Sequence, residues 1–437
     1  MPARTRRSPA VRAPWIGVLV ALLLVAAAVA APALTGWNVR VNSFPPLHAG
    51  WDPRVGPGTV PALLLAGLLA WWAVPLAERL PWRRLLLLVF VVGLLWLLVL
   101  AFVDGPRGVS EILQTPYEYL RTARRTTDLH ATLQEYVGRI RYDAAPRNWP
   151  VHVAGHPPGA LAFFVVLVRV GLGAGFAAGL VVTVLAATTA VAVLVTVRAL
   201  GAETLARRAA PFVAFGPAAV WQAVSADAMF AAVAAWGLCC LALAATRHLA
   251  WAVPAGLLLG YAVMLSYGLP LLGVAAVAVL AAARRWRPLV PAVLAALVVV
   301  GAFWVAGFSY LEALPAIHDR YWEGVGGRRP AAYWLWADLA ALAVGAGPVA
   351  FAGLAHLARA QGPGRRVALW LSGAGVLMVL AADLSQMSRG EVERIWLPFV
   401  PWLLLSCGLL PERWRRVGLV VQLAVALVVQ HLLVTGW

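Results

Sequence analysis

Long apolar runs separated by short basic segments dominate the pattern of this chain. Runs such as WIGVLVALLLVAAAVAAPAL (15–34) and LVPAVLAALVVVGAFWVAGF (289–308) reach the roughly 20 residues that an α-helix needs to cross a bilayer. The first run exceeds the roughly 7–15 apolar residues of a signal peptide, so we interpret it as an uncleaved span. The pattern predicts an all-α polytopic membrane protein with thirteen spans, at residues 15–35, 59–77, 85–103, 175–198, 209–224, 226–246, 249–266, 268–283, 288–308, 332–355, 366–383, 395–410 and 417–435.

One apolar piece, residues 159–171, is too short to cross a bilayer. HVAGHPPG (152–159) leads into it and GLGAG follows it, so we expect a re-entrant half-helix that stays on one side. With the N-terminus in the cytoplasm, 20 of the 35 arginines but only three of the 18 acidic residues fall in cytoplasmic segments. The positive-inside rule predicts this distribution, and counting 159–171 as a full span would destroy it.

The composition agrees with a membrane protein and argues against several other classes of protein. Apolar residues make up 62% of the 437 residues and charged residues only 12%, which is too little polar surface for a soluble protein of this size. The net charge of +17 resides in short loops between spans, so membrane orientation explains it and nucleic acid is not a predicted partner. Cys239, Cys240 and Cys407 all lie in apolar runs and predict neither a disulfide framework nor a thiolate metal site.

The acidic residues gather in the segments predicted to lie outside the cell, and the centres of the spans carry essentially no charge. An ion-coupled transporter usually needs ionisable groups near the midplane of the membrane. The distribution therefore favours chemistry or binding at the outer surface.

The long outer loop, residues 104–158, contains two amphipathic stretches. TDLHATLQEYVGRI (127–140) places five apolar side chains on one helical stripe: Leu129, Leu133, Tyr136, Val137 and Ile140. SEILQTPYEYL (110–120) predicts a shorter helix with Ser110 as its N-cap. Two such helices on the membrane surface would form a lid over an outer site.

The order and sidedness of several motifs resemble the GT-C superfamily of polytopic glycosyltransferases, which includes protein O-mannosyltransferases and the lipid A aminoarabinose transferase. A span ends at Asp104 in FVDGPRG, surface helices follow, and HPPG leads the half-helix. Another span closes near Pro217 in FGPAAVW, before Asp227 in SADAMF. MLSYGL, HDRYWEGVGGRRP and MSRGEVERIWLPF look like a group of actinobacterial membrane proteins assigned to the same superfamily.

The resemblance covers about residues 85–410, which we interpret as the core, flanked by a tail and hairpin (1–84) and a C-terminal helix (411–437). It implies transfer of a sugar from a polyprenyl-phosphate donor to a glycan, lipid or protein acceptor of the cell envelope, at the outer face of the cell membrane. The polyprenyl tail needs an apolar groove, and the aromatic residues of YWLWADL (333–339) are candidates to line it.

The resemblance makes Asp104 the catalytic base and Asp227 a second acid of the same site. Asp104 is followed by glycine, where many relatives have a second acid, so Asp52 is the alternative base. A carboxylate can accept the proton of the acceptor hydroxyl, and arginine can hold the leaving phosphate.

Two outer segments supply candidate substrate contacts. In SRGEVER, Arg389, Glu391 and Arg394 form either a phosphate clamp or a surface ion-pair network. In HDRYW, Arg320 and Tyr321 either contact phosphate and sugar or belong to an interfacial aromatic belt.

His156 is a candidate for a hydrogen bond to substrate or for a structural turn. Together with His152 it has the spacing of a metal-ligating pair on a helix, but the prolines that follow break the helix, so we predict no metal ligand there. Whether the predicted sugar transfer needs a divalent cation stays open. Two other functions stay open as well: a transporter or flippase of a lipid-linked or polysaccharide precursor, and a non-catalytic partner in a cell-envelope complex.

Overall fold

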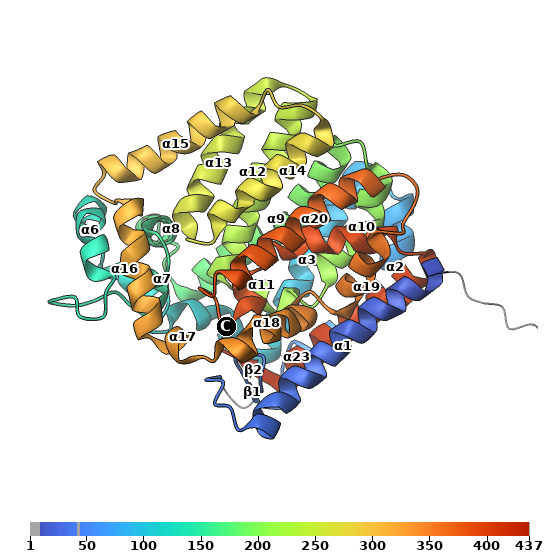
Figure 1. Cartoon of the computed structure of the whole chain (residues 1–437), viewed down its shortest axis with the longest axis horizontal. Coiled ribbons are helices and arrows are strands. Elements are labelled where there is room, and N and C mark those ends of the chain that lie inside the picture. Colours follow the sequence, from blue (N-terminus) through green and yellow to red (C-terminus); the bar gives the residue numbers. More distant parts are fainter. Residues whose placement is uncertain (1–8, 42–43, 437) are drawn as a thin grey trace, which may run out of the picture.

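The computed structural model describes residues 9–41 and 44–436, so the basic tail at 1–8 lies outside the described residues. The described chain is all-α apart from one pair of short strands (Figure 1). Seven of its helices are long and apolar enough to cross a membrane: α1 (Pro9–Thr35), α2 (Thr59–Arg79), α3 (Trp82–Ala101), α9 (Gly175–Ala199), α12 (Ala226–Thr246), α20 (Arg365–Leu384) and α23 (Glu412–Leu432).

Two helix pairs would raise the number of spans to nine if each pair crosses as one unit. Helix α15 (Leu289–Val305) meets α16 (Tyr310–Glu323) at a bend of 75°, and α18 (Ala331–Gly345) meets α19 (Pro348–Leu357) at 103°. The structure therefore confirms a multi-pass helical membrane protein, whereas the predicted thirteen spans are not confirmed.

The difference arises where a predicted span is a short or broken helix. The helices concerned are α10 (Glu203–Phe215), α11 (Ala219–Gln222), α13 (Ala252–Leu265), α14 (Leu272–Ala283), α21 (Val392–Ile395) and α22 (Val400–Leu404). At 1.5 Å per residue, a helix of 12–14 residues covers about 20 Å, less than the roughly 30 Å of a bilayer core. Apolar composition alone does not reveal such breaks.

The remaining elements are short. They are α4 (Arg107–Ser110), α5 (Tyr119–Arg125), α6 (Leu129–Glu135), α7 (Val151–Gly155), α8 (Pro158–Arg169), α17 (Val325–Arg328), the 3₁₀ helices η1 (Phe102–Asp104), η2 (Ile112–Gln114), η3 (Val137–Arg139), η4 (Leu249–Trp251), η5 (Leu269–Leu271) and η6 (Leu405–Leu409), and the strands β1 (Ala49–Trp51) and β2 (Leu433–Thr435).

The HVAGHPPG segment breaks the chain between two helices, as predicted. Helix α7 ends at Gly155, the backbone of His156 and Pro157 is extended, and α8 begins at Pro158. Proline is well suited to this first turn because the N–H that it lacks would have no partner within the helix. Helix α8 has only 12 residues, in keeping with the predicted half-helix.

The two amphipathic predictions in the outer loop had different outcomes. Leu133, Tyr136 and Ile140 are buried along α6 and the turn after it, which confirms their stripe. The helix predicted to start at Ser110 is wrong, because Ser110 is the last residue of α4 and the next α-helix, α5, starts at Tyr119. Pro116 explains the error: a residue that precedes proline avoids the helical region, and Thr115 is extended, with ψ 158°.

Three segments predicted to be cytoplasmic lie together at one end of the bundle. Arg207 on α10 donates to the backbone carbonyls of Ala77 and Leu80, at the end of α2. Glu78 pairs with Arg415 at the start of α23. At the opposite ends of α2 and α23, β1 pairs with β2 in antiparallel register. The segments that the charge pattern predicts to be on one side of the membrane therefore lie at the same end of the structure.

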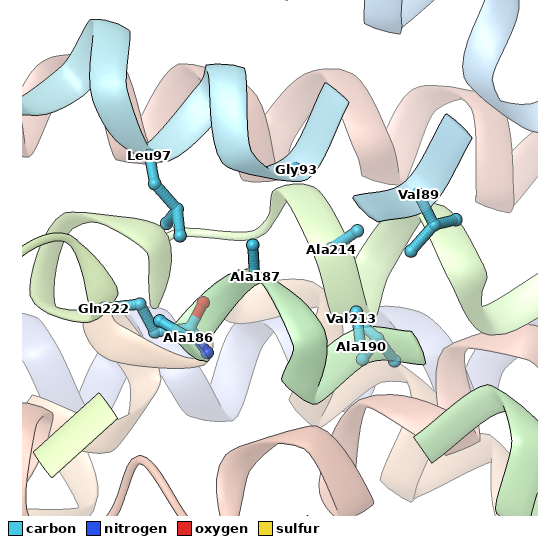
Figure 2. A pocket seen from close by; sticks show the side chains of 9 residues that line it. All are labelled: Val89, Gly93, Leu97, Ala186, Ala187, Ala190, Val213, Ala214 and Gln222. Carbon is cyan, nitrogen blue, oxygen red and sulfur yellow. The ribbon is translucent and has the colours of Figure 1, made fainter. Parts of the chain in front are cut away.

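A small cavity lies between α3, α9 and α10 (Figure 2). Its volume is about 10 Å³, room for one water molecule. Small side chains such as Ala186 and Ala187 line it, and Gln222 lies at one end. Beyond its own helical turn, a Cβ atom placed on Gly93 would meet no atom within 4 Å, so the cavity leaves free space beside α3.

Candidate functional site

Four charged side chains of alternating sign, three of them buried and Glu391 partly buried, form a continuous row, which we call the ion chain: Asp227, Arg394, Glu391 and Arg329. Arg394 donates to the Asp227 carboxylate at 2.5 Å and to Glu391 at 3.2 Å. Glu391 also accepts from Arg329 at 3.1 Å. The side chains of both arginines and of Asp227 are at most 7% exposed, and that of Glu391 is 19% exposed.

The local sequence explains the positions of Asp227, in the first turn of α12, and of Arg394, in α21. Ser225 caps α12 by accepting from the N–H of Asp227 at 3.1 Å, which leaves the Asp227 carboxylate in the first helical turn. Negative charge is favourable there because of the helix dipole. On the other side, Gly390 and Glu391 both have positive φ, 79° and 64°, and this tight turn directs the chain into α21 with Arg394.

Arg389 and Tyr321, both predicted substrate contacts, instead stabilise the chain just before that turn. The backbone N–H of Arg389 donates to the Tyr321 hydroxyl at 2.8 Å. The Arg389 guanidinium donates to the carbonyl of Arg329 at 2.7 Å and lies 4.6 Å from the centre of the Trp322 ring. Their contacts in the structure are with the protein itself, so a role as substrate contacts stays a prediction.

Two histidines from the HVAGHPPG segment lie beside the ion chain. His156 is close enough to Asp227 and Arg394 for their charges to act on its ring. Its Nδ1 lies 2.8 Å from the carbonyl oxygen of His152, and its ring packs against Phe230 and Tyr119. His152 in turn pairs with Glu118 at 2.7 Å, with both side chains under 10% exposed.

The electrostatics keep the ion chain charged. Burial alone would raise the pKa of Glu391, but Arg394 and Arg329 outweigh it and lower the value to about 2. Burial would lower the pKa of Arg394, yet Asp227 and Glu391 hold it above its ordinary value. Burial lowers the pKa of His156 despite the opposing charge of Asp227, so this ring is neutral at pH 7. The site therefore combines fixed charges with one neutral imidazole.

Glu393, on α21, is a buried acid that behaves differently from Glu391. It is 2% exposed, and burial raises its pKa to about 7, with Glu391 adding to the effect and Arg394 opposing it. Glu393 can therefore gain or lose a proton near neutral pH, which Glu391 cannot.

Asp104 belongs to a different set of contacts. It pairs with Arg54 from the loop after β1 and accepts from Gln430 of α23 at 2.9 Å. None of the hydrogen bonds and ion pairs found among the described residues joins Asp104 to the ion chain. Asp52, the alternative base, is exposed where β1 ends. Of the two acids that the resemblance assigns to catalysis, Asp227 is the one that lies with His156.

Arg320 also lies apart from the ion chain in its contacts. It donates to the carbonyls of Ile140 and Trp149, at 2.6 and 2.9 Å, and stacks over the ring of Tyr142 at 4.2 Å. These bonds fasten α16 to the outer loop. Its buried guanidinium is thus engaged by backbone, and a phosphate contact would require it to exchange partners.

Sequence reasoning passed over Arg329, Glu118 and Glu393 as site residues. Arg329 lies 62 positions before Glu391, and Glu118 lies 34 before His152, so no periodic pattern links them. A usable signal was a charge placed directly against aromatic or apolar residues, as in RRPAAYW and VERIW. Within residues 9–41 and 44–436, no three His, Cys, Asp or Glu side chains are grouped so that they could hold a metal ion.

No protein-family model matches this chain, and no curated protein is significantly similar to it.

Proposed function

We propose that the protein transfers a sugar from a polyprenyl-phosphate donor to an acceptor hydroxyl at the extracytoplasmic face of the membrane, in a site built on the ion chain. The observation that carries the proposal is the pairing of the buried Asp227, Arg394 and Arg329 with the partly buried Glu391, beside the ring of His156. The motif order that resembles the GT-C superfamily supplies the reaction class.

The energetic cost of the ion chain supports a function for it. Removing a charged group from water costs several kcal/mol, and attraction between partners seldom recovers more than that. Apolar side chains of similar size would fill the same space at lower cost. These four charges, three of them buried, are therefore best explained by a charged ligand that they recognise.

Each group has a chemical role in this proposal. Arg394 and Arg329 bind the phosphate of the donor, for which the planar guanidinium is well shaped. Asp227 accepts the proton of the acceptor hydroxyl, and His156 orients the sugar through a hydrogen bond. Asp104 is the competing base, since the resemblance favours it while its contacts lie elsewhere.

Transfer from a radiolabelled polyprenyl-phosphate sugar, measured with purified protein in proteoliposomes, distinguishes the two bases. Loss of a general base lowers the rate by roughly 10²–10⁴-fold. We expect this loss in Asp227→Asn and less than a tenfold loss in Asp104→Asn. The control is Asp143→Asn, an exposed acid of the same outer loop, which should keep full activity. Full activity in Asp227→Asn would refute its role as the base.

A transporter or flippase of a lipid-linked precursor is the second candidate, and one observation favours it. Helices α18 and α19 meet at 103°, and discontinuous helices of this kind often form transport sites. Movement of a fluorescent lipid-linked sugar between the leaflets of the same proteoliposomes, with no transfer to any acceptor, would replace the first proposal with this one.

A further inference from the structure

The end of the bundle opposite the strand pair carries a groove on its outer surface, between α2 and α23. Its volume is about 430 Å³, within the roughly 300–1,000 Å³ of small-ligand sites. Trp71, Trp72, Pro75 and Arg79 of α2 line one wall, and Arg416 and Val420 of α23 line the other. Trp71 is 73% exposed and Val420 is 48% exposed, so the groove opens toward the lipid around the helices.

The groove is charged at one end and apolar along its length. Trp72, Pro75 and Arg79 follow the spacing i, i+3, i+7, so they share one face of α2. Seven residues of helix place Trp72 about 10 Å along the axis from Arg79. A tryptophan of an interfacial belt would lie level with the charges, whereas Trp72 lies deeper, where acyl chains are. The shape therefore suits an amphiphile with a polar head and an apolar tail.

The charge at the head of the groove is positive. Arg79 makes no ion pair with any residue in the described part of the chain. Arg416 pairs with Glu412 at 2.8 Å, but both side chains are more than half exposed, so this pair is weak. Glu78, which precedes Arg79 in the sequence, is already bound by Arg415 and Arg208. Arg83, Arg84 and Arg413 add further positive charge close by in the sequence.

We propose that this groove binds one anionic phospholipid of the surrounding bilayer, with the phosphate between Arg79 and Arg416 and an acyl chain along Trp71 and Trp72. Basic pockets between helices at a membrane surface are a known way to select anionic head groups. The assignment concerns a structural or regulatory lipid and does not depend on the function proposed for the ion chain.

Native mass spectrometry of the purified, delipidated protein tests the proposal. Phosphatidylglycerol and phosphatidylethanolamine with identical acyl chains are titrated separately. Wild type should retain one phosphatidylglycerol in preference to phosphatidylethanolamine. Each arginine near an anionic surface contributes about 1 kcal/mol, so Arg79→Gln with Arg416→Gln should weaken phosphatidylglycerol binding by about 30-fold.

The matched control removes two arginines from another loop on the same side, Arg284→Gln with Arg285→Gln, and should bind like wild type. A measurement on wild type alone guards against misfolding of the variant: raising the salt to 1 M should weaken phosphatidylglycerol binding, since the Debye length falls to about 3 Å. Equal binding of the two lipids, insensitivity to salt, or equal loss in the control would overturn the proposal. Displacement by an equimolar polyprenyl phosphate would move the site to the donor lipid instead.

Discussion

Replacing Glu393 by glutamine removes a buried carboxylate and keeps its size. Glu393 is 2% exposed, and burial raises its pKa to about 7, above the ordinary value of 4.5. Between pH 4.5 and 7, the folded protein holds a proton that the unfolded chain has released. The free energy of unfolding therefore falls as the pH rises through this window, and the loss is complete above pH 7.

The size of the effect follows from the two pKa values. At about 1.4 kcal/mol per pH unit, the ionised Glu393 costs wild type about 3 kcal/mol at pH 8 and little at pH 5. Glu393→Gln cannot ionise, so it should be more stable than wild type at pH 8, with the advantage largely gone at pH 5. Unfolding entropy of about 2 cal/mol/K per residue converts 3 kcal/mol into about 3–4 °C of melting temperature for this length.

Thermal unfolding in detergent, followed by tryptophan fluorescence at pH 5, 6, 7 and 8, measures this difference. Glu111→Gln is the control, because the Glu111 side chain is 62% exposed and its ion pair among the described residues is a long one, with Arg107 at 3.5 Å. It should change the melting temperature by less than 1 °C at every pH. A Glu393→Gln variant that is less stable than wild type at pH 8, or equally shifted at all four values, would refute the reasoning.

Three other predictions address the ion chain, the packing and the topology. Arg394→Ala leaves the buried Asp227 carboxylate without the cation that it shares with Glu391, so it should lower the free energy of unfolding by about 3–5 kcal/mol, whereas Arg394→Lys should lose less; urea unfolding in mixed micelles measures both. Gly93→Ala should raise the melting temperature, because its Cβ enters open space, while Gly256→Ala should lower it, because a Cβ there would lie 2.1 Å from a backbone oxygen of α15. In a variant without the three native cysteines, Thr204→Cys should resist an impermeant thiol reagent in intact cells and Asp143→Cys should react; ready labelling at 204 would refute the predicted sidedness.

The sequence was sufficient for what depends on composition and local chemistry. Long apolar runs predicted the seven long helices, and HPPG predicted the break before α8 because proline acts on its own backbone. Composition does not indicate where a helix breaks. Residues 249–283, predicted as two spans, therefore form shorter helices in the structure. The GxxxG spacing of Gly256 and Gly260, which lets α13 approach α15 closely, is the local pattern in the sequence that indicates this packing.

The site could be predicted only as a set of candidates. The sequence predicts Asp227, Arg394 and His156 as candidates, but their proximity joins segments about 70 to 240 residues apart in the chain, which no local pattern encodes. Arg320 illustrates the converse: its motif suggested a ligand contact, yet its donors are bound to two backbone carbonyls. The sequence around an arginine does not show which hydrogen-bond acceptors will lie beside its guanidinium in the folded protein.

The balance of charge in the ion chain links donor binding to the base in the proposed reaction. The charges of the two arginines and the two acids sum to zero, so an incoming phosphate must compete with Asp227 and Glu391 for Arg394. Glu391 also contacts Arg329, whereas Asp227 has Arg394 as its ion-pair partner among the described residues. Transfer of Arg394 toward the phosphate would therefore leave Asp227 buried without a cation, beside a neutral His156. A carboxylate in that position binds a proton more strongly, so arrival of the donor would strengthen the base at the moment when the acceptor hydroxyl must lose its proton.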